Sequence, residues 1–240
     1  AGANLTPVSL ELGGKSPFVA FADADLDAVV RQAVNQFDNA GQVCLAGTRL
    51  IVERSMHDAF LKRFVEAASA LVQGDPREDA TEIGPLITRE HLERVDGFVQ
   101  RARADGARVV FGGGPNEELG GLYYRPTLFT DAPEGSEILT QEVFGPVLTL
   151  QTFETEEQAI ELADSTDYGL AAILYTGDEA RAERVSSALV AGTVWVNCFF
   201  VRDLAAPFGG ARGSGIGREG GVWSFDFYAD VKNVCTAPWT

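Results

Sequence analysis

A cysteine in a loop bracketed by glycines is the first residue of this sequence that could do chemistry. Cys44 lies in the run Phe37–Arg49, F-D-N-A-G-Q-V-C-L-A-G-T-R, between Gly41 and Gly47. A helical apolar pattern precedes this loop and a short β-type run follows it. A reactive thiol needs such a place, because a turn at the end of rigid elements lets a substrate approach the sulfur. A lone loop cysteine is more often buried and structural, so the neighbouring residues must show whether Cys44 is reactive.

Glu11 is the residue that could take a proton from this thiol or from a water beside it. A free thiol with a pKa of about 8.5 is only a few per cent thiolate at neutral pH. A carboxylate that accepts a proton, directly or through one water, corrects this. Glu11 stands next to Gly13 and Gly14, where a glutamate is otherwise most often an ordinary surface residue.

The sequence predicts no metal site and no dinucleotide fingerprint. His57 and His91 lie on charged helical segments, without HExxH spacing or paired cysteines. The run Gly215–Gly220 matches G-x-G-x-x-G letter for letter. A true fingerprint follows a strand and opens a helix, whereas here a loop precedes the run and an extended tail follows it. We therefore expect a glycine-shaped substrate loop at this position.

Alternating helices and strands must position these residues. Apolar residues at i, i+3, i+4 and i+7 predict a helix over 26–37, capped by Asp23 or Asp25, and Ser55, Thr88 and Thr155 open further helices. Short links between helix and strand predict an α/β fold with a mostly parallel sheet and helices on both faces. We expect helices over 26–37, 55–71, 88–102, 155–164 and 178–189, and strands over 50–52, 108–111, 123–129, 147–153, 171–175 and 193–196.

The end of the chain has a different pattern. Apolar and polar residues alternate over 225–235, which predicts a strand with one buried face. A lone exposed strand of this length needs a partner. We therefore expect one domain over 1–221 and a projecting oligomerisation tail over 222–240, which pairs with a second copy of the chain. The alternative is a strand folded back on its own sheet.

Composition excludes several classes of partner. The 240 residues carry a formal net charge of -16, which argues against binding to nucleic acid or to an anionic membrane surface. Three cysteines, at positions 44, 198 and 235, are an odd number and do not form a disulfide framework. With no signal-peptide pattern and no apolar run of bilayer length, we expect a cytoplasmic protein.

Three motifs, in their order along the chain, resemble the motifs of the aldehyde dehydrogenase superfamily. They are L-E-L-G-G-K-S-P from Leu10, G-Q-x-C around Cys44, and E-V-F-G-P-V from Glu142. The resemblance implies that Cys44 is the nucleophile and that Glu11 is the general base. It further implies that Glu142 holds the nicotinamide-ribose hydroxyls and that Phe144 lies against the nicotinamide end of the cofactor. Two further residues of the first motif, Leu12 and Gly13, are implied at the cofactor site.

A fourth stretch narrows the resemblance. N-C-F-F-V-R-D-L from Asn197, together with the tail, is similar to hydroxymuconic semialdehyde dehydrogenases, which act on aldehydes bearing a carboxylate. Arg202 would suit such a substrate, because guanidinium binds carboxylate through a two-pronged fork. Phe208, in the P-F-G-G run that follows, is implied at the substrate mouth. An ion pair of Arg202 with Asp203 or Glu219 explains the arginine equally well.

The resemblance covers only the catalytic domain of the family. Family members are longer, and nothing here corresponds to the cofactor domain that precedes L-E-L-G-G. We expect NAD(P)-dependent oxidation of an aldehyde to an acid in a full-length parent, with weak or no NAD binding by this chain alone. The choice between NAD and NADP is open. Two alternatives are a thiol esterase at Cys44 and a non-catalytic domain that associates through its tail.

Overall fold

A seven-stranded sheet forms the centre of the molecule. The structure, a computed structural model, describes residues 1–239. The strands lie in the order β4-β5-β6-β3-β2-β7-β8, and all neighbours are parallel except the antiparallel pair β4 and β5. This confirms the predicted α/β fold with a mostly parallel sheet. The strands are β2 (Pro17–Ala20), β3 (Arg49–Glu53), β4 (Arg108–Phe111), β5 (Thr127–Thr130), β6 (Val147–Phe153), β7 (Ala171–Tyr175) and β8 (Thr193–Val196).

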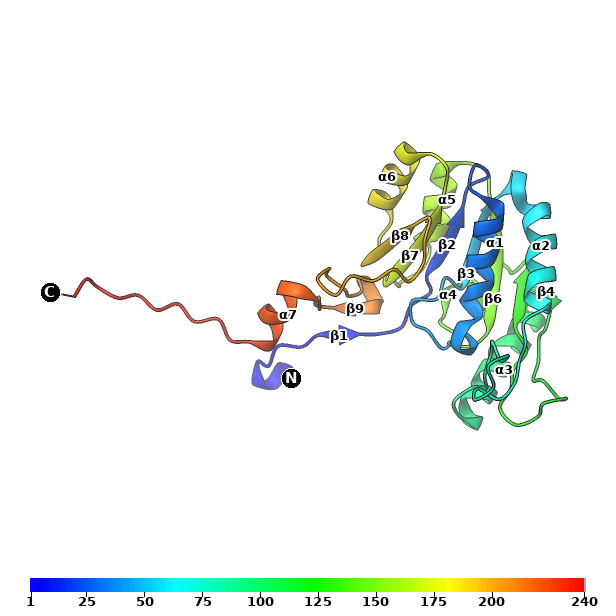
Figure 1. Ribbon diagram of the computed structural model, residues 1–240, viewed down its shortest axis with the longest axis horizontal. Coiled ribbons are helices and arrows are strands. Elements are labelled where there is room, and N and C mark those ends of the chain that lie inside the picture. The colour runs from blue at the N-terminus through cyan, green and yellow to red at the C-terminus, as the bar shows by residue number, and fades with distance from the viewer. Residues whose placement is uncertain (240) are drawn as a thin grey trace.

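Helices cover both faces of this sheet (Figure 1). Alternate residues of β2 point to opposite sides, so that Phe18 and Ala20 join one apolar core and Val19 joins another. The first core includes residues of α1 (Leu26–Val34), α2 (His57–Ser69), α3 (Arg89–Ala104) and the short α4 (Glu137–Thr140). The second core includes residues of α5 (Glu156–Ala163) and α6 (Glu179–Ala188).

Most helix starts follow the predicted capping residues. Asp25, Thr88 and Thr155 each accept a main-chain hydrogen bond at the first turn of a helix. The cap expected at Ser55 is wrong. A 3-10 turn, η3 (Arg54–Met56), comes first, α2 has no side-chain cap, and the Ser55 hydroxyl donates to Glu53 instead.

The helix expected over 26–37 changes type near its end. Helix α1 ends at Val34, and the chain continues as the 3-10 segment η2 (Asn35–Gly41), which is kinked at Asp38–Ala40. Asn39 and Ala40 have left-handed backbone angles, so the right-handed turns end before them, close to the predicted helix end. The kink turns the chain toward the Cys44 loop.

A small second sheet lies beside the domain. Strand β1 (Leu10–Glu11) pairs antiparallel with β9 (Gly215–Ile216), so that Glu11 lies opposite Gly215. Two 3-10 turns, η1 (Gly2–Asn4) and η4 (Arg212–Ser214), complete this region. Figure 1 shows the blue β1 running along the orange β9, although the two are far apart in sequence.

The strand predicted over 225–235 is wrong for its first four residues. Residues Gly221–Tyr228 form helix α7, and residues 229–239 belong to no strand of the chain. A strand needs a partner for its main-chain groups, whereas a helix satisfies them locally, as the bond from Ala229 N–H to Phe225 C=O illustrates. The tail does project from the domain, as expected (Figure 1). None of the helices in residues 1–239 is long and apolar enough to cross a membrane.

Candidate active site

The Cys44 loop is shaped by a tight reversal of the chain just before it. After the left-handed residues of η2, Gly41 also has a positive φ of 68°. A side chain at Gly41 would begin 2.1 Å from the carbonyl oxygen of Gly145, so only glycine lets the two segments approach this closely. On the other side, a Cβ at Gly14 would lie 2.6 Å from the Cys44 carbonyl oxygen. The Cys44 loop is therefore packed between the two other motif segments.

Glu142 lies across the glycine pair of the first motif. Its Oε1 accepts a hydrogen bond from the Gly14 N–H at 3.0 Å. A methyl group at Gly13 would lie 1.9 Å from Oε2, so glycine is required there for the carboxylate to occupy this position. Burial raises the pKa of Glu142, and the Gly14 N–H and the charge of Lys15 oppose that rise. Leu12, which precedes Gly13 in the first motif, is about half exposed.

Glu11 lies at the edge of the small sheet, next to the glycine-rich segment. A Cβ at Gly209 would lie 3.0 Å from Glu11 Oε1. Burial and then the charge of Glu219 raise the pKa of Glu11, while the Gly210 N–H and Arg218 lower it. A carboxylate with a raised pKa holds a proton more readily, which suits a base that takes a proton from water.

The charges of both carboxylates act on the Cys44 thiol. Burial first, then the charge of Glu142, and finally that of Glu11 raise the pKa of Cys44. Main-chain N–H groups of Cys44 and Leu45 act in the opposite direction. The thiol is therefore the favoured form in this arrangement, and a proton acceptor is needed for the sulfur to become a nucleophile.

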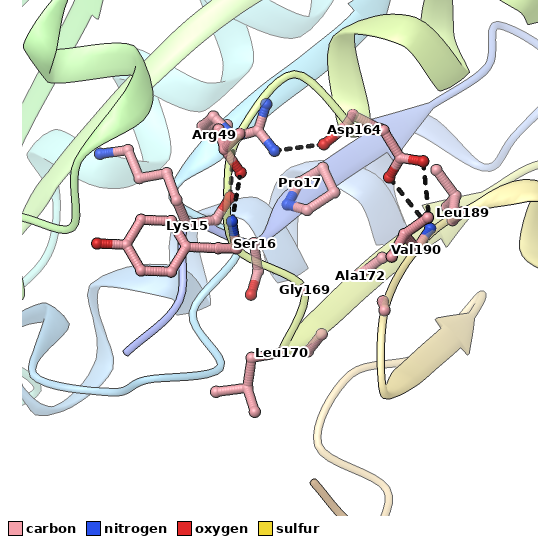
Figure 2. Close-up of a pocket in the computed structure, with 15 residues that line it drawn as sticks. Lys15, Ser16, Pro17, Arg49, Asp164, Gly169, Leu170, Ala172, Leu189 and Val190 are labelled. Carbon is pink, nitrogen blue, oxygen red and sulfur yellow. Dashed lines mark hydrogen bonds between the residues drawn. The ribbon is translucent and has the colours of Figure 1, made fainter. Parts of the chain in front are cut away.

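Two buried cations beside this site were missed in the sequence. Lys15 is 1% exposed, and burial, followed by the neighbouring charge of Arg49, lowers its pKa to about 7. Arg49 is also 1% exposed, and it donates to the carbonyl oxygens of Lys15, Leu162 and Ala163 at 2.8, 2.6 and 2.5 Å. Figure 2 shows Arg49 between Lys15 and the Asp164 region, with the Lys15 side chain directed away from Asp164. The position of Lys15 inside the L-E-L-G-G-K motif is the sequence signal that could have indicated this lysine.

Glu219 is a further residue whose place in the site was missed. Its main chain exchanges two hydrogen bonds of 2.7 Å with Phe208. This bridge holds the G-x-G-x-x-G run against the P-F-G-G run, which places Glu219 where its charge acts on Glu11. The spacing of the run predicts only a glycine-shaped loop. It does not show that the charge of Glu219, within this run, acts on Glu11.

Arg202 and Phe208 lie together at a cavity of about 170 Å³. The Arg202 guanidinium lies 5.1 Å from the Phe208 ring centroid and 5.7 Å from that of Phe200, within the range of cation–π contacts. No carboxylate of residues 1–239 lies within 4 Å of Arg202. The alternative of an ion pair with Asp203 or Glu219 is therefore wrong for this structure.

Known proteins resemble this chain in sequence and in fold. The model of the aldehyde dehydrogenase family matches residues 1–234. The chain is 46% identical over 240 residues to the 2-hydroxymuconic semialdehyde dehydrogenase of Pseudomonas sp. (strain CF600), covering 98% of this chain and 49% of that protein. It is 43% identical to the betaine aldehyde dehydrogenase of Cereibacter sphaeroides (strain ATCC 17029 / ATH 2.4.9), covering 98% of this chain and 48% of that protein. The expected similarity to hydroxymuconic semialdehyde dehydrogenases is thus confirmed.

Solved structures agree with these relatives. The crystal structure of the Staphylococcus aureus betaine aldehyde dehydrogenase in complex with NAD+ superimposes with a TM-score of 0.92 at 40% identity, covering 95% of this chain and 46% of that one. The chain spans about half the length of the relatives it matches. Sequence, fold and family model lead to one conclusion: the chain belongs to the aldehyde dehydrogenase family.

Proposed function

We propose that this chain supplies the catalytic half of an NAD(P)-dependent aldehyde dehydrogenase. Cys44 is the nucleophile and Glu11 is the general base. The observation that carries the proposal is the packing of three segments distant in sequence: Gly14 lies against the Cys44 carbonyl and donates to Glu142, and Gly41 lies against Gly145. Open α/β sheets form ligand sites where loops meet at one edge in this way.

The reaction follows from the residues at this edge. The Cys44 thiol releases its proton to water and the sulfur attacks the aldehyde carbon, which gives a thiohemiacetal. The Cys44 N–H stabilises the oxygen that becomes negative. The nicotinamide cofactor, when bound, supplies a hydride acceptor, and the product on Cys44 is a thioester. Glu11 then takes a proton from water, the hydroxide attacks the thioester carbon, and the acid leaves as the thiol is restored.

The residues present fit the nicotinamide end of such a cofactor. The Gly14 N–H fixes one oxygen of Glu142, while the second oxygen lies over Gly13, where any side chain would collide with it. A fixed carboxylate of this kind accepts hydrogen bonds from vicinal hydroxyl groups. Phe144, on the same turn, offers an aromatic face. Glu142 and Phe144 would hold the ribose and nicotinamide, and Leu12 and Gly13 belong to the same proposed cofactor site.

The substrate we propose is a semialdehyde that carries a distal carboxylate. No carboxylate of residues 1–239 lies within 4 Å of the Arg202 guanidinium, which packs on the rings of Phe200 and Phe208 in a cavity that Asp203 and Glu219 also line. A guanidinium without an ion-pair partner binds a carboxylate through two parallel hydrogen bonds. The similarity to 2-hydroxymuconic semialdehyde dehydrogenase supports this substrate class.

We also propose that the tail joins the chain to a second copy. Helix α7 and the residues after it expose large apolar side chains, which are Val222, Phe225, Tyr228, Val231, Val234 and Trp239. Exposed apolar groups in such number mark an interaction surface. A symmetric pair of chains would remove them from water.

One experiment separates the dehydrogenase from its two alternatives. The protein that contains this chain is assayed for NADH formation from 2-hydroxymuconic semialdehyde and for hydrolysis of an activated ester, each with and without Cys44→Ser. The proposal expects both activities, and the loss of both in the variant. Ester hydrolysis alone would indicate a thiol esterase, and no activity in either assay would indicate an interaction domain.

A further inference from the structure

Helix α3 holds three consecutive carbonyl groups of the Glu142 segment. His91 Nε2 lies 2.6 Å from the carbonyl oxygen of Phe144. Arg94 donates to the carbonyl oxygens of Val143 at 2.6 Å and Glu142 at 2.9 Å. Because a carbonyl oxygen only accepts, Nε2 of His91 carries the hydrogen in this bond. No main-chain donor within residues 1–239 reaches these three oxygens, so the two side chains are their protein partners.

The held segment has a strained backbone. Phe144 has a φ of 58°, a left-handed conformation that an aromatic residue rarely adopts without external support. The His91 ring lies edge-on to the Phe144 ring, with 5.9 Å between centroids. Val95, one turn beyond His91, packs so closely on Gly145 that a side chain there would begin 2.7 Å from a Val95 methyl carbon. One face of α3 thus supports the whole turn Glu142–Gly145.

The same turn contacts the other two site segments. Its Glu142 carboxylate accepts from Gly14, and its Gly145 carbonyl lies against Gly41 of the segment that leads to Cys44. A shift of the turn would therefore move the carboxylate and the ring together. Neither His91 nor Arg94 has a place in the chemistry derived above, so their bonds to this turn lack another explanation.

We propose that His91 and Arg94 are positioning residues that fix the Glu142–Gly145 turn in the conformation that binds the nicotinamide end of the cofactor. This inference rests on the proposed function, which assigns Glu142 and Phe144 to that end. The two side chains act through main-chain carbonyls: they supply the hydrogen bonds that keep Phe144 left-handed and Glu142 over Gly13.

The test uses the protein that contains this chain, with His91→Leu and Arg94→Met as the disruptive changes. His91→Gln is the conservative variant, because its amide N–H can still donate to the Phe144 carbonyl. Arg89→Met is the matched control, since Arg89 is exposed on the first turn of the same helix. The first readout is amide hydrogen exchange of Gly14 and Val147, whose N–H groups donate to the Glu142 carboxylate and the Gly145 carbonyl of this turn, and the second is the KM for NAD+ against the KM for the aldehyde.

Both disruptive variants are expected to speed exchange of these two N–H groups about tenfold, because local opening of the turn releases them. The KM for NAD+ should rise about tenfold while the aldehyde KM changes little. His91→Gln should restore most of both effects, and Arg89→Met should show neither. Exchange at the wild-type rate would overturn the inference, as would faster exchange with an unchanged KM for NAD+. The proposed function is judged separately, by the activity lost in Cys44→Ser.

Discussion

The buried Lys15 should make the stability of this chain depend strongly on pH. The pKa of Lys15 falls from 10.5 to about 7 on folding, chiefly because burial disfavours the charged amine. Between these values the unfolded chain binds a proton that the folded chain has released, so the free energy of unfolding rises with pH. Integrating this difference from pH 7 to pH 9 gives a gain of about 2 kcal/mol from this one group.

Replacement of the lysine by an uncharged side chain of similar length should remove that gain. Lys15→Met keeps the volume and loses the titrating group, whereas Lys62→Met changes an exposed lysine of α2 and serves as the control. Urea unfolding is followed at pH 7, 8 and 9 for the three proteins. We expect the rise in stability in the wild type and in Lys62→Met, and a rise smaller by about 2 kcal/mol in Lys15→Met. Equal pH dependence in all three proteins would refute a buried amine with a lowered pKa.

Three other predictions concern the site and the tail. Gly13→Ala places a methyl group 1.9 Å from Glu142 Oε2 and should raise the KM for NAD+ about tenfold, whereas Gly2→Ala, which meets nothing within 4 Å, should not. Arg202→Leu should raise the KM for acidic semialdehydes by a factor that corresponds to about 1.5–3 kcal/mol and leave the KM for neutral aldehydes nearly unchanged. Equal effects on both KM values would indicate a structural role. Light scattering should show an oligomer for the intact chain and a smaller species for one that ends after Gly221, and two monomers at micromolar concentration would contradict the proposed role of the tail.

The core of the fold was predictable because its signals are local. Apolar periodicity and a capping residue specify α3 and α5 within a few residues each, and both begin where Thr88 and Thr155 indicate. The kink at Asp38–Ala40 was not predictable from the same signals. Asn39 and Gln42 exchange side-chain hydrogen bonds across the left-handed residues, and the residue types of Asn39 and Ala40 alone do not require that conformation.

The tail shows how a local pattern can mislead. The alternation over 225–235 fits a strand, but strand pairing depends on a partner that the pattern does not name, and the first four of these residues are helical. In the candidate site, short motifs indicate the residues to which we assign chemistry. They could not give the support from His91 and Arg94, because those bonds join residues about fifty positions apart.

The most direct test of the central proposal is a rapid-mixing measurement of NADH formation by the protein that contains this chain. With Glu11→Gln, the account predicts a burst close to one NADH per Cys44, followed by slow turnover, because the thioester forms but water is not activated. With Cys44→Ser it predicts no burst. Steady turnover of Glu11→Gln at the wild-type rate, or a burst from Cys44→Ser, would contradict the roles assigned to these two residues.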